Sequence, residues 1–309
     1  MLLQRQGSSG GMIALLLLPL LALIAAPGET ATPTRGESID VGGFSLFLHC
    51  QGKGLPVVVL DAGLGGASSD WRKVQPELAK HNRTCIYDRA GYGRSDSGPL
   101  PRTSSRIAGE LRTLLKRAGL PPPYVLVGHS FGGFNARLFA GLFREEVAGV
   151  VLVDAPHESQ ADALFEEGIL GVLDLKGWLR SLWSPDRLSF LPAESALIAE
   201  MLGIKTKTWQ AILNEAAAYE VSRQELQTTP MPPAIPLGVL MHGRRIFPAG
   251  VLGDGLEQDW LRANRDLVRA QRRGHFAIAP ESGHLIPAEQ PELVVQMVRK
   301  LLGMRAGAR

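Results

Sequence analysis

The sequence has little excess charge and few aromatic residues. Its 33 lysines and arginines nearly balance 30 aspartates and glutamates, which leaves a formal charge of +3, and only 6% of the residues are aromatic. The basic residues are scattered, with no stripe interleaved with aromatic side chains of the kind that nucleic-acid-binding surfaces carry. We therefore expect no nucleic-acid partner.

The sequence also lacks a second long apolar run. The single one, residues 12–26, follows Arg5, is interrupted by Pro19 and ends in small residues. This is the layout of an export signal, and the run is shorter than the ~20 residues that a spanning helix needs. We assign residues 1–27 to a signal peptide or N-terminal membrane anchor, with a disordered tail as a third reading, and 28–40 to a linker. The protein is then expected to be exported (periplasmic or secreted) or membrane-anchored by its N-terminus.

Cysteine is scarce. The two cysteines, Cys50 and Cys85, each lie in a strand-like run. An exported chain with an even number of cysteines can form a disulfide. Two buried free thiols are the alternative, because cysteine is common in protein cores. The sequence leaves both readings open.

Beyond the linker, apolar runs of strand length alternate with segments of helical periodicity. The clearest helix carries Ile107, Leu111 and Leu114 on one face and stops before Gly119. This alternation predicts an α/β protein with a mostly parallel central sheet and helices on both faces. The predicted strands are 44–50, 57–60, 85–87, 125–127, 150–153, 237–240 and 275–279.

One interval breaks the alternation. Residues 157–235 contain helical patterns but no good strand, and they end in a proline-rich connector that cannot continue a helix. We predict a helical cap (157–235) inserted between two parts of one core, 41–156 and 236–305. The length of 309 residues suits one large domain with an insertion.

The segment Gly128-His129-Ser130-Phe131-Gly132 follows an apolar strand and precedes a helical pattern. A G-x-S-x-G in that setting indicates a nucleophile elbow, in which flanking glycines permit a tight turn that exposes the serine hydroxyl. Ser130 is therefore a candidate covalent nucleophile. The alternative is a glycine-rich turn with an inert serine.

A serine nucleophile needs a base and a group that orients the base. Among seven histidines, His284 lies in the loop between the last predicted strand and the closing helix, from which it can reach back over the sheet. Asp154 ends the strand after the elbow and is our choice for the acid, with Asp254 as the reserve. The order serine, acid, histidine is the one that this architecture uses.

The negative charge that builds on a carbonyl oxygen during attack needs preorganised N–H donors. We assign one to the backbone amide of Phe131, the residue after the nucleophile, and one to the amide of Leu64 in a glycine-rich turn after the strand 57–60. Asp61 is expected to form hydrogen bonds within that turn.

With these residues in place, the sequence resembles the α/β-hydrolase-fold serine hydrolases of the capped, esterase-like kind. The resemblance covers about residues 41–302 and rests on the turn 60–65, the turn 87–96, the elbow 128–133 and the loop 282–284. Two departures stand out: the acid that the family commonly has after the penultimate strand is missing near Gly243, and Asp61-Ala62-Gly63 replaces the frequent His-Gly. The resemblance therefore implies Asp154 as an alternative placement of the acid, and Ser130 disfavours relatives with an aspartate nucleophile.

These residues predict hydrolysis of a carboxylic ester of a small or medium, fairly apolar substrate through an acyl-enzyme, with no metal or organic cofactor. Cleavage of an amide, such as release of an N-terminal residue, is the alternative on the same residues. A non-catalytic protein that presents the cap pocket to a hydrophobic ligand is the rival from another class.

Overall fold

The computed structural model describes residues 36–160, 205–247 and 250–303. The predicted signal or anchor, 1–27, and the larger part of the predicted cap lie outside these residues. In the part of the chain that is described, no helix combines the length and the apolar character needed to cross a bilayer.

In the described part of the chain, eight strands form a single sheet in the order β1-β2-β4-β3-β5-β6-β7-β8. β1 and β2, and β2 and β4, pair antiparallel, and all other neighbours pair parallel. The central strands β3, β5 and β6 are runs rich in valine that are buried except at Ala148, as parallel strands covered on both faces require. The strands are β1 (Glu37–Asp40), β2 (Ser45–Gln51), β3 (Val57–Asp61), β4 (Thr84–Tyr87), β5 (Tyr124–His129), β6 (Val147–Val153), β7 (Leu237–His242) and β8 (Gly274–Ala279).

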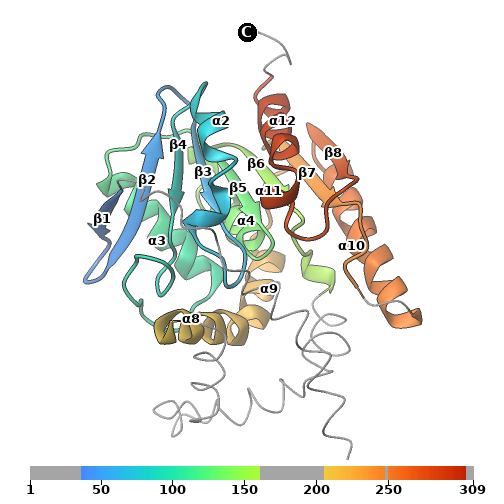
Figure 1. Cartoon of the computed structure of the whole chain (residues 1–309), viewed down its shortest axis with the longest axis horizontal. Helices are drawn as coiled ribbons and strands as arrows, with labels where there is room; N and C mark the ends of the chain where they lie inside the picture. Colours follow the sequence, from blue (N-terminus) through green and yellow to red (C-terminus); the bar gives the residue numbers. More distant parts are fainter. Residues whose placement is uncertain (1–35, 161–204, 248–249, 304–309) are drawn as a thin grey trace, which may run out of the picture. The chain divides into compact units, whose positions relative to one another are not determined.

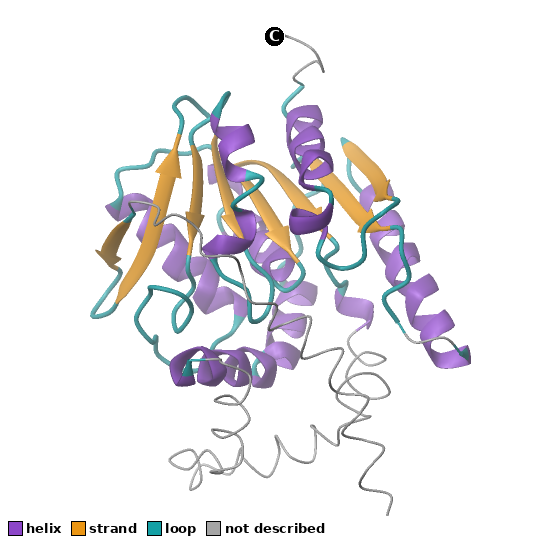
Figure 2. Cartoon of the chain, in the orientation of Figure 1, coloured by secondary structure: helices purple, strands orange, loops and turns teal. Residues whose placement is uncertain are grey.

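Helices cover both faces of this sheet (Figures 1 and 2). The helices α2, α11 and α12 lie on one face, and α3, α4 and α10 lie on the other. These elements are α2 (Gln75–Ala79), α3 (Ser104–Arg117), α4 (Gly132–Leu142), α8 (Thr206–Ala217), α9 (Tyr219–Thr228), α10 (Val251–Arg269), α11 (Ile286–Glu289) and α12 (Pro291–Leu301), with short 3-10 turns at Ser68–Trp71, Arg144–Glu146 and Glu158–Gln160.

Alternate residues of the central strands build the core under α12. Val125 and Val127 of β5 and Val151 and Val153 of β6 form one buried cluster with residues of α12 such as Val298. Successive side chains of a strand point to opposite faces, so the intervening residues of β5 and β6 face α4. The predicted α/β architecture with a mostly parallel sheet is confirmed.

The sheet edge differs from the sequence prediction in one place. Residues 37–40, assigned to the linker, form β1, which pairs with β2 from Glu37 to Asp40. This strand has four residues, mostly exposed, and therefore lacks the apolar run by which the other strands were found.

Cys50 and Cys85 form a disulfide in this structure. They face each other in the antiparallel pair β2 and β4, with their Cα atoms 4.1 Å apart. The two cysteines are 35 positions apart in the sequence, and closing a loop of that length is expected to stabilise the fold by roughly 4 kcal/mol in the chain-entropy account.

Two helices, α8 and α9, lie in the last part of the segment that we predicted as a cap, and α9 packs against α3 and α4. The backbone amide of Ser104 donates to Ser222 Oγ (3.0 Å), and that of Ser105 donates to Glu225 Oε2 (2.9 Å). Both amides lie in the first turn of α3, where backbone donors lack partners within the helix. Side chains of α9 therefore cap α3.

Candidate active site

The turn from β5 into α4 places Ser130 in a left-handed backbone conformation, with φ of 50°. The Ser130 amide donates to Val153 O (3.0 Å), which fixes the turn against the end of β6. A Cβ added at Gly128 would lie 2.3 Å from Gly132 O, and one added at Gly132 would lie 2.5 Å from Asp61 O. Both flanking positions therefore require glycine, as a nucleophile elbow does.

Asp154 follows β6 directly and lies next to the elbow, because His129 pairs with Val153 in the parallel register of β5 and β6. Its φ is 45°, and Ser130 and Asp154 are the two non-glycine residues with positive φ among the described residues. Such conformations are sparsely populated and persist where the surrounding structure imposes them.

The structure brings His284 to Asp154. His284 Nδ1 lies 2.7 Å from Asp154 Oδ2, with the aspartate side chain fully buried and that of His284 26% exposed. Burial opposes ionisation of Asp154, but hydrogen bonds from His242 and His284 outweigh it and lower the pKa of Asp154 from 3.8 to about 2. An ionised Asp154 accepts a hydrogen bond from a protonated Nδ1 of His284. In a neutral His284 the Nε2 then carries no proton and can accept one.

The reserve acid is placed elsewhere. Asp254 lies in the first turn of α10, is exposed, and forms an ion pair with Arg245 of the loop after β7. Of the two aspartates that the sequence left open, Asp154 is the one that contacts His284.

The glycine-rich turn after β3 lies beside the elbow. A Cβ built on Gly63 would be 3.1 Å from Ser130 Cβ, and the turn is closed by a hydrogen bond from the Gly66 amide to Gly63 O (3.1 Å). Leu64 packs against a buried cluster formed by Tyr92, Ala211 and Ile212. We assigned the oxyanion donors to this turn and to Phe131, the residue just before α4, and that assignment stays a prediction.

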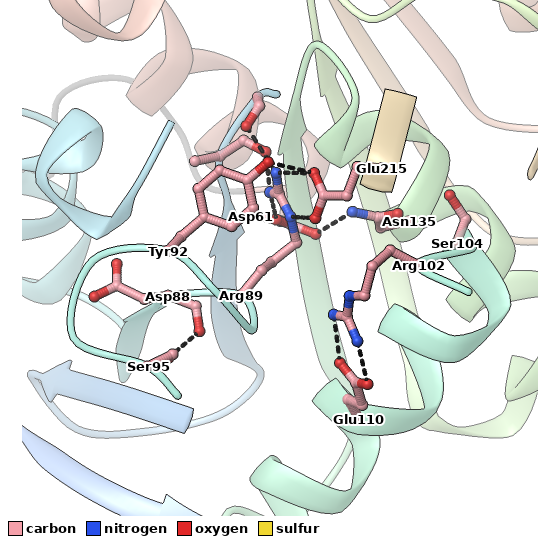
Figure 3. Close-up of polar contacts among 12 residues, drawn as sticks. Asp61, Asp88, Arg89, Tyr92, Ser95, Arg102, Ser104, Glu110, Asn135 and Glu215 are labelled. Atoms are coloured by element: carbon pink, nitrogen blue, oxygen red, sulfur yellow. Dashed lines mark hydrogen bonds and ion pairs between the residues drawn. The ribbon is translucent and has the colours of Figure 1, made fainter. Parts of the chain in front are cut away.

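A buried ionic network holds this turn in place (Figure 3). Arg89, after β4, donates to Ala62 O (2.5 Å) and Gly63 O (2.8 Å), and pairs with Asp61 Oδ1 (2.7 Å). It also binds both carboxylate oxygens of Glu215 in α8, at 2.8 and 2.9 Å. The Arg89 guanidinium is thus a tether that joins the β3 turn to α8.

The role expected for Asp61 is wrong. Asp61 does not close its own turn but accepts hydrogen bonds from Arg89 and from Asn135 Nδ2 in α4 (3.0 Å). Burial raises the pKa of Asp61, and the nearby Arg89 charge opposes that rise. The turn is held by Arg89 on its carbonyl oxygens instead, a contact between residues 27 positions apart in the sequence.

Known proteins share this arrangement of elements. A family model described as the alpha/beta hydrolase fold matches residues 56–177. The chain has the α/β-hydrolase fold. It is 28% identical over 279 residues to an AB hydrolase superfamily protein of Gibberella zeae, which covers 80% of this chain and 86% of that one.

Solved structures agree on the fold. A thermophilic esterase from Thermogutta terrifontis is 24% identical with a TM-score of 0.55, over 87% of this chain and 98% of the esterase. An enol-lactonase from Burkholderia xenovorans is 18% identical with a TM-score of 0.59, over 86% of this chain and all (100%) of that one.

Two further histidines, His129 and His242, contact the candidate site, and the sequence analysis selected neither of them. His129 Nε2 donates to His284 O (2.8 Å), because a carbonyl can only accept, and the two rings lie 4.8 Å apart. Burial lowers the pKa of His129 to about 3, so its ring is neutral. His129 therefore braces the loop that carries His284.

The second is His242, the last residue of β7. Its Nδ1 lies 2.6 Å from Asp154 Oδ1, and its Nε2 lies 2.6 Å from Glu257 Oε1 in α10. The sequence signal for it was its place just after a predicted strand, 237–240; the structure shows that this strand lies beside β6, so that the two carboxyl ends meet at one sheet edge. Within the described ranges, no group of three or more His, Cys, Asp or Glu residues is arranged to hold a metal ion.

Proposed function

We propose that this protein is a serine hydrolase that cleaves carboxylic esters of small or medium, fairly apolar substrates through an acyl-enzyme. Ser130 is the nucleophile, His284 the general base and acid, and Asp154 the residue that orients His284. The backbone amides of Leu64 and Phe131 stabilise the oxyanion. The observation that carries the proposal is the 2.7 Å contact of His284 Nδ1 with Asp154, which lies beside the Ser130 elbow.

The proposed reaction has two halves. Ser130 Oγ attacks the ester carbonyl carbon while its proton moves to His284 Nε2, and that proton leaves with the alcohol when the C–O bond breaks. Water then attacks the acyl-enzyme, gives a proton to the same nitrogen, and releases the carboxylic acid as Ser130 regains its hydrogen. The ionised Asp154 stabilises the imidazolium that forms in each half.

The test uses p-nitrophenyl esters of increasing acyl length and labelling with a fluorophosphonate. We expect turnover of the short-chain esters and labelling of the folded protein, and loss of both in Ser130→Ala. The matched control is Ser38→Ala at an exposed position of β1, which should leave both unchanged. Full activity of Ser130→Ala would overturn the proposal.

The same assay separates the other readings. Faster cleavage of aminoacyl amides than of esters by the same protein, lost equally in Ser130→Ala, would keep the roles of the residues and replace the substrate class. Folded protein that neither turns over esters or amides nor reacts with the fluorophosphonate would instead favour a binding protein with this fold.

A further inference from the structure

His242 is held between two carboxylates from different elements. Its Nδ1 faces Asp154 Oδ1 and its Nε2 faces Glu257 Oε1, each at 2.6 Å, and only 1% of its side chain is exposed. Asp154 follows β6, Glu257 belongs to α10, and His242 ends β7. The pair of Asp154 and His284 uses neither of these contacts, because His284 faces Oδ2 of Asp154 and His242 faces Oδ1.

The number of protons on the ring follows from this geometry. A neutral imidazole carries one N–H, and its second nitrogen can only accept a hydrogen bond. An ionised carboxylate also only accepts, so a neutral ring would place a lone pair against one carboxylate. A doubly protonated ring satisfies both contacts.

Both carboxylates lie within hydrogen-bond distance of several nitrogen atoms of rings and backbone amides. Asp154 is near His284 Nδ1, His242 Nδ1 and the His242 backbone amide, the last at 3.2 Å from Oδ1. Glu257 Oε2 accepts hydrogen bonds from the backbone amides of Ile246 and Phe247, both at 3.3 Å. Hydrogen bonds of this kind favour the charged form of a carboxylate.

Among the described residues, the charges around His242 come from three elements. Asp154 after β6 and Glu257 of α10 touch the ring, and His284 of the loop after β8 shares Asp154 with it. Burial disfavours the charged ring, but the two carboxylates together raise the pKa of His242 above its ordinary value. Trp260 of α10 adds an aromatic edge without a charge.

We propose that His242 is a fixed imidazolium that positions Asp154 and lowers the basicity of His284. It occupies Oδ1 of Asp154, which leaves Oδ2 for His284 and prevents the carboxylate from rotating. As a cation that shares the same carboxylate, it also reduces the negative potential that Asp154 exerts on His284. His284 is therefore neutral, and able to act as a base, at lower pH than Asp154 alone would allow.

The protonation state is tested without reference to activity. We would label the histidines of the full chain with ¹⁵N and assign His242 from the signals lost in His242→Gln or moved in Glu257→Gln. We expect both ring nitrogens of His242 to be protonated from pH 6 to 8, and the ring to titrate at lower pH in Glu257→Gln. A singly protonated His242 at pH 7 in the wild-type protein would overturn the inference.

The effect on catalysis rests on the proposed function and is read from the pH profile of kcat/KM for a p-nitrophenyl ester. We expect the acid limb of His242→Gln to move to higher pH by about one unit, because removal of the cation raises the basicity of His284. A purely structural role would reduce activity without moving this limb. An acid limb that stays in place, or moves to lower pH, contradicts the inference.

The control is His81→Gln, at an exposed position after α2, which should keep the wild-type profile. The two experiments fail separately. If no ester is turned over but His242 carries two protons, the proposed function is wrong and the charge assignment stands. If the enzyme turns over esters but His242 is neutral, the charge assignment is wrong and the proposed function stands.

Discussion

At the scale of single residues, Ser130 and Asp154 each combine a strained backbone conformation with a proposed catalytic role. Their φ values of 50° and 45° are conformations that non-glycine residues adopt at an expense of about 1–3 kcal/mol each. At both positions the turn follows a buried strand and aims a polar side chain at the same sheet edge. The surrounding hydrogen bonds, such as that from the Asp154 amide to Leu240 O (2.8 Å), keep these turns in place.

The assignment of Asp154 as the acid is tested by Asp154→Asn. We expect kcat/KM for a p-nitrophenyl ester to fall by about 10³- to 10⁴-fold, because an amide N–H can face His284 Nδ1 and hold the ring in the wrong tautomer. Asp254→Asn is the matched control, since Asp254 pairs with Arg245 at the surface, and it should stay within about two-fold of wild type. Wild-type activity of Asp154→Asn, with loss in Asp254→Asn, would reverse the assignment.

At the scale of elements, contacts between segments far apart in the sequence hold the turns that follow the carboxyl ends of the strands. Arg89 joins the turn after β3 to α8 while its side chain is only 2% exposed. Tyr92 adds a hydrogen bond from its hydroxyl to Glu215 Oε2 (2.8 Å). A guanidinium suits this position because its planar set of donors can serve several acceptors at once.

Replacing Arg89 by lysine tests this tether. One ammonium group cannot replace the contacts to two carboxylates and two carbonyls, so we expect Arg89→Lys to lower the free energy of unfolding by about 3 kcal/mol and to reduce kcat/KM as well. Urea denaturation and the ester assay measure the two effects. The control is Arg117→Lys. Arg117 forms an ion pair with Asp40, and the two side chains are 49% and 54% exposed. We therefore expect this substitution to change the free energy of unfolding by less than about 1 kcal/mol. Equal stability of both variants would contradict a structural role for Arg89.

At the scale of the whole molecule, the buried Asp154 and the partly buried Glu158 make folding depend on pH. The pKa of Asp154 is lowered from 3.8 to about 2, and that of Glu158, paired with Arg137, from 4.5 to about 2. A carboxylate whose pKa is lower in the folded state stabilises the fold above its unfolded pKa. This contribution disappears as the pH falls through the folded pKa.

Acid unfolding should therefore show the contribution of Asp154. We expect the wild-type protein to lose about 2 kcal/mol of stability through this residue as the pH falls from about 5 to below 2, and Asp154→Asn to show a smaller slope over that range. Urea denaturation at several pH values measures the slope. Asp254→Asn should follow the wild type, and an unchanged slope in Asp154→Asn would show that Asp154 does not titrate as its contacts imply.

The sequence by itself determined the features that depend on neighbouring residues. Runs rich in valine predicted the central strands, and the glycines around Ser130 predicted the elbow, because strand formation and tight turns are decided by side chains within a few positions. The position of His284 after the last strand also followed from this order. The four-residue β1 was missed because an exposed edge strand has no such apolar run.

Only the tertiary structure decided which of these residues meet. Asp154 contacts His284, 130 positions away, and His242, 88 positions away, and it contacts them through side chains at the ends of three different strands or the loops that follow them. The choice between Asp154 and Asp254, the second histidine on Asp154 and the Arg89 tether all depend on the order of strands in the sheet and on side-chain directions. Local sequence patterns carry neither kind of information, since both are set by packing across the core.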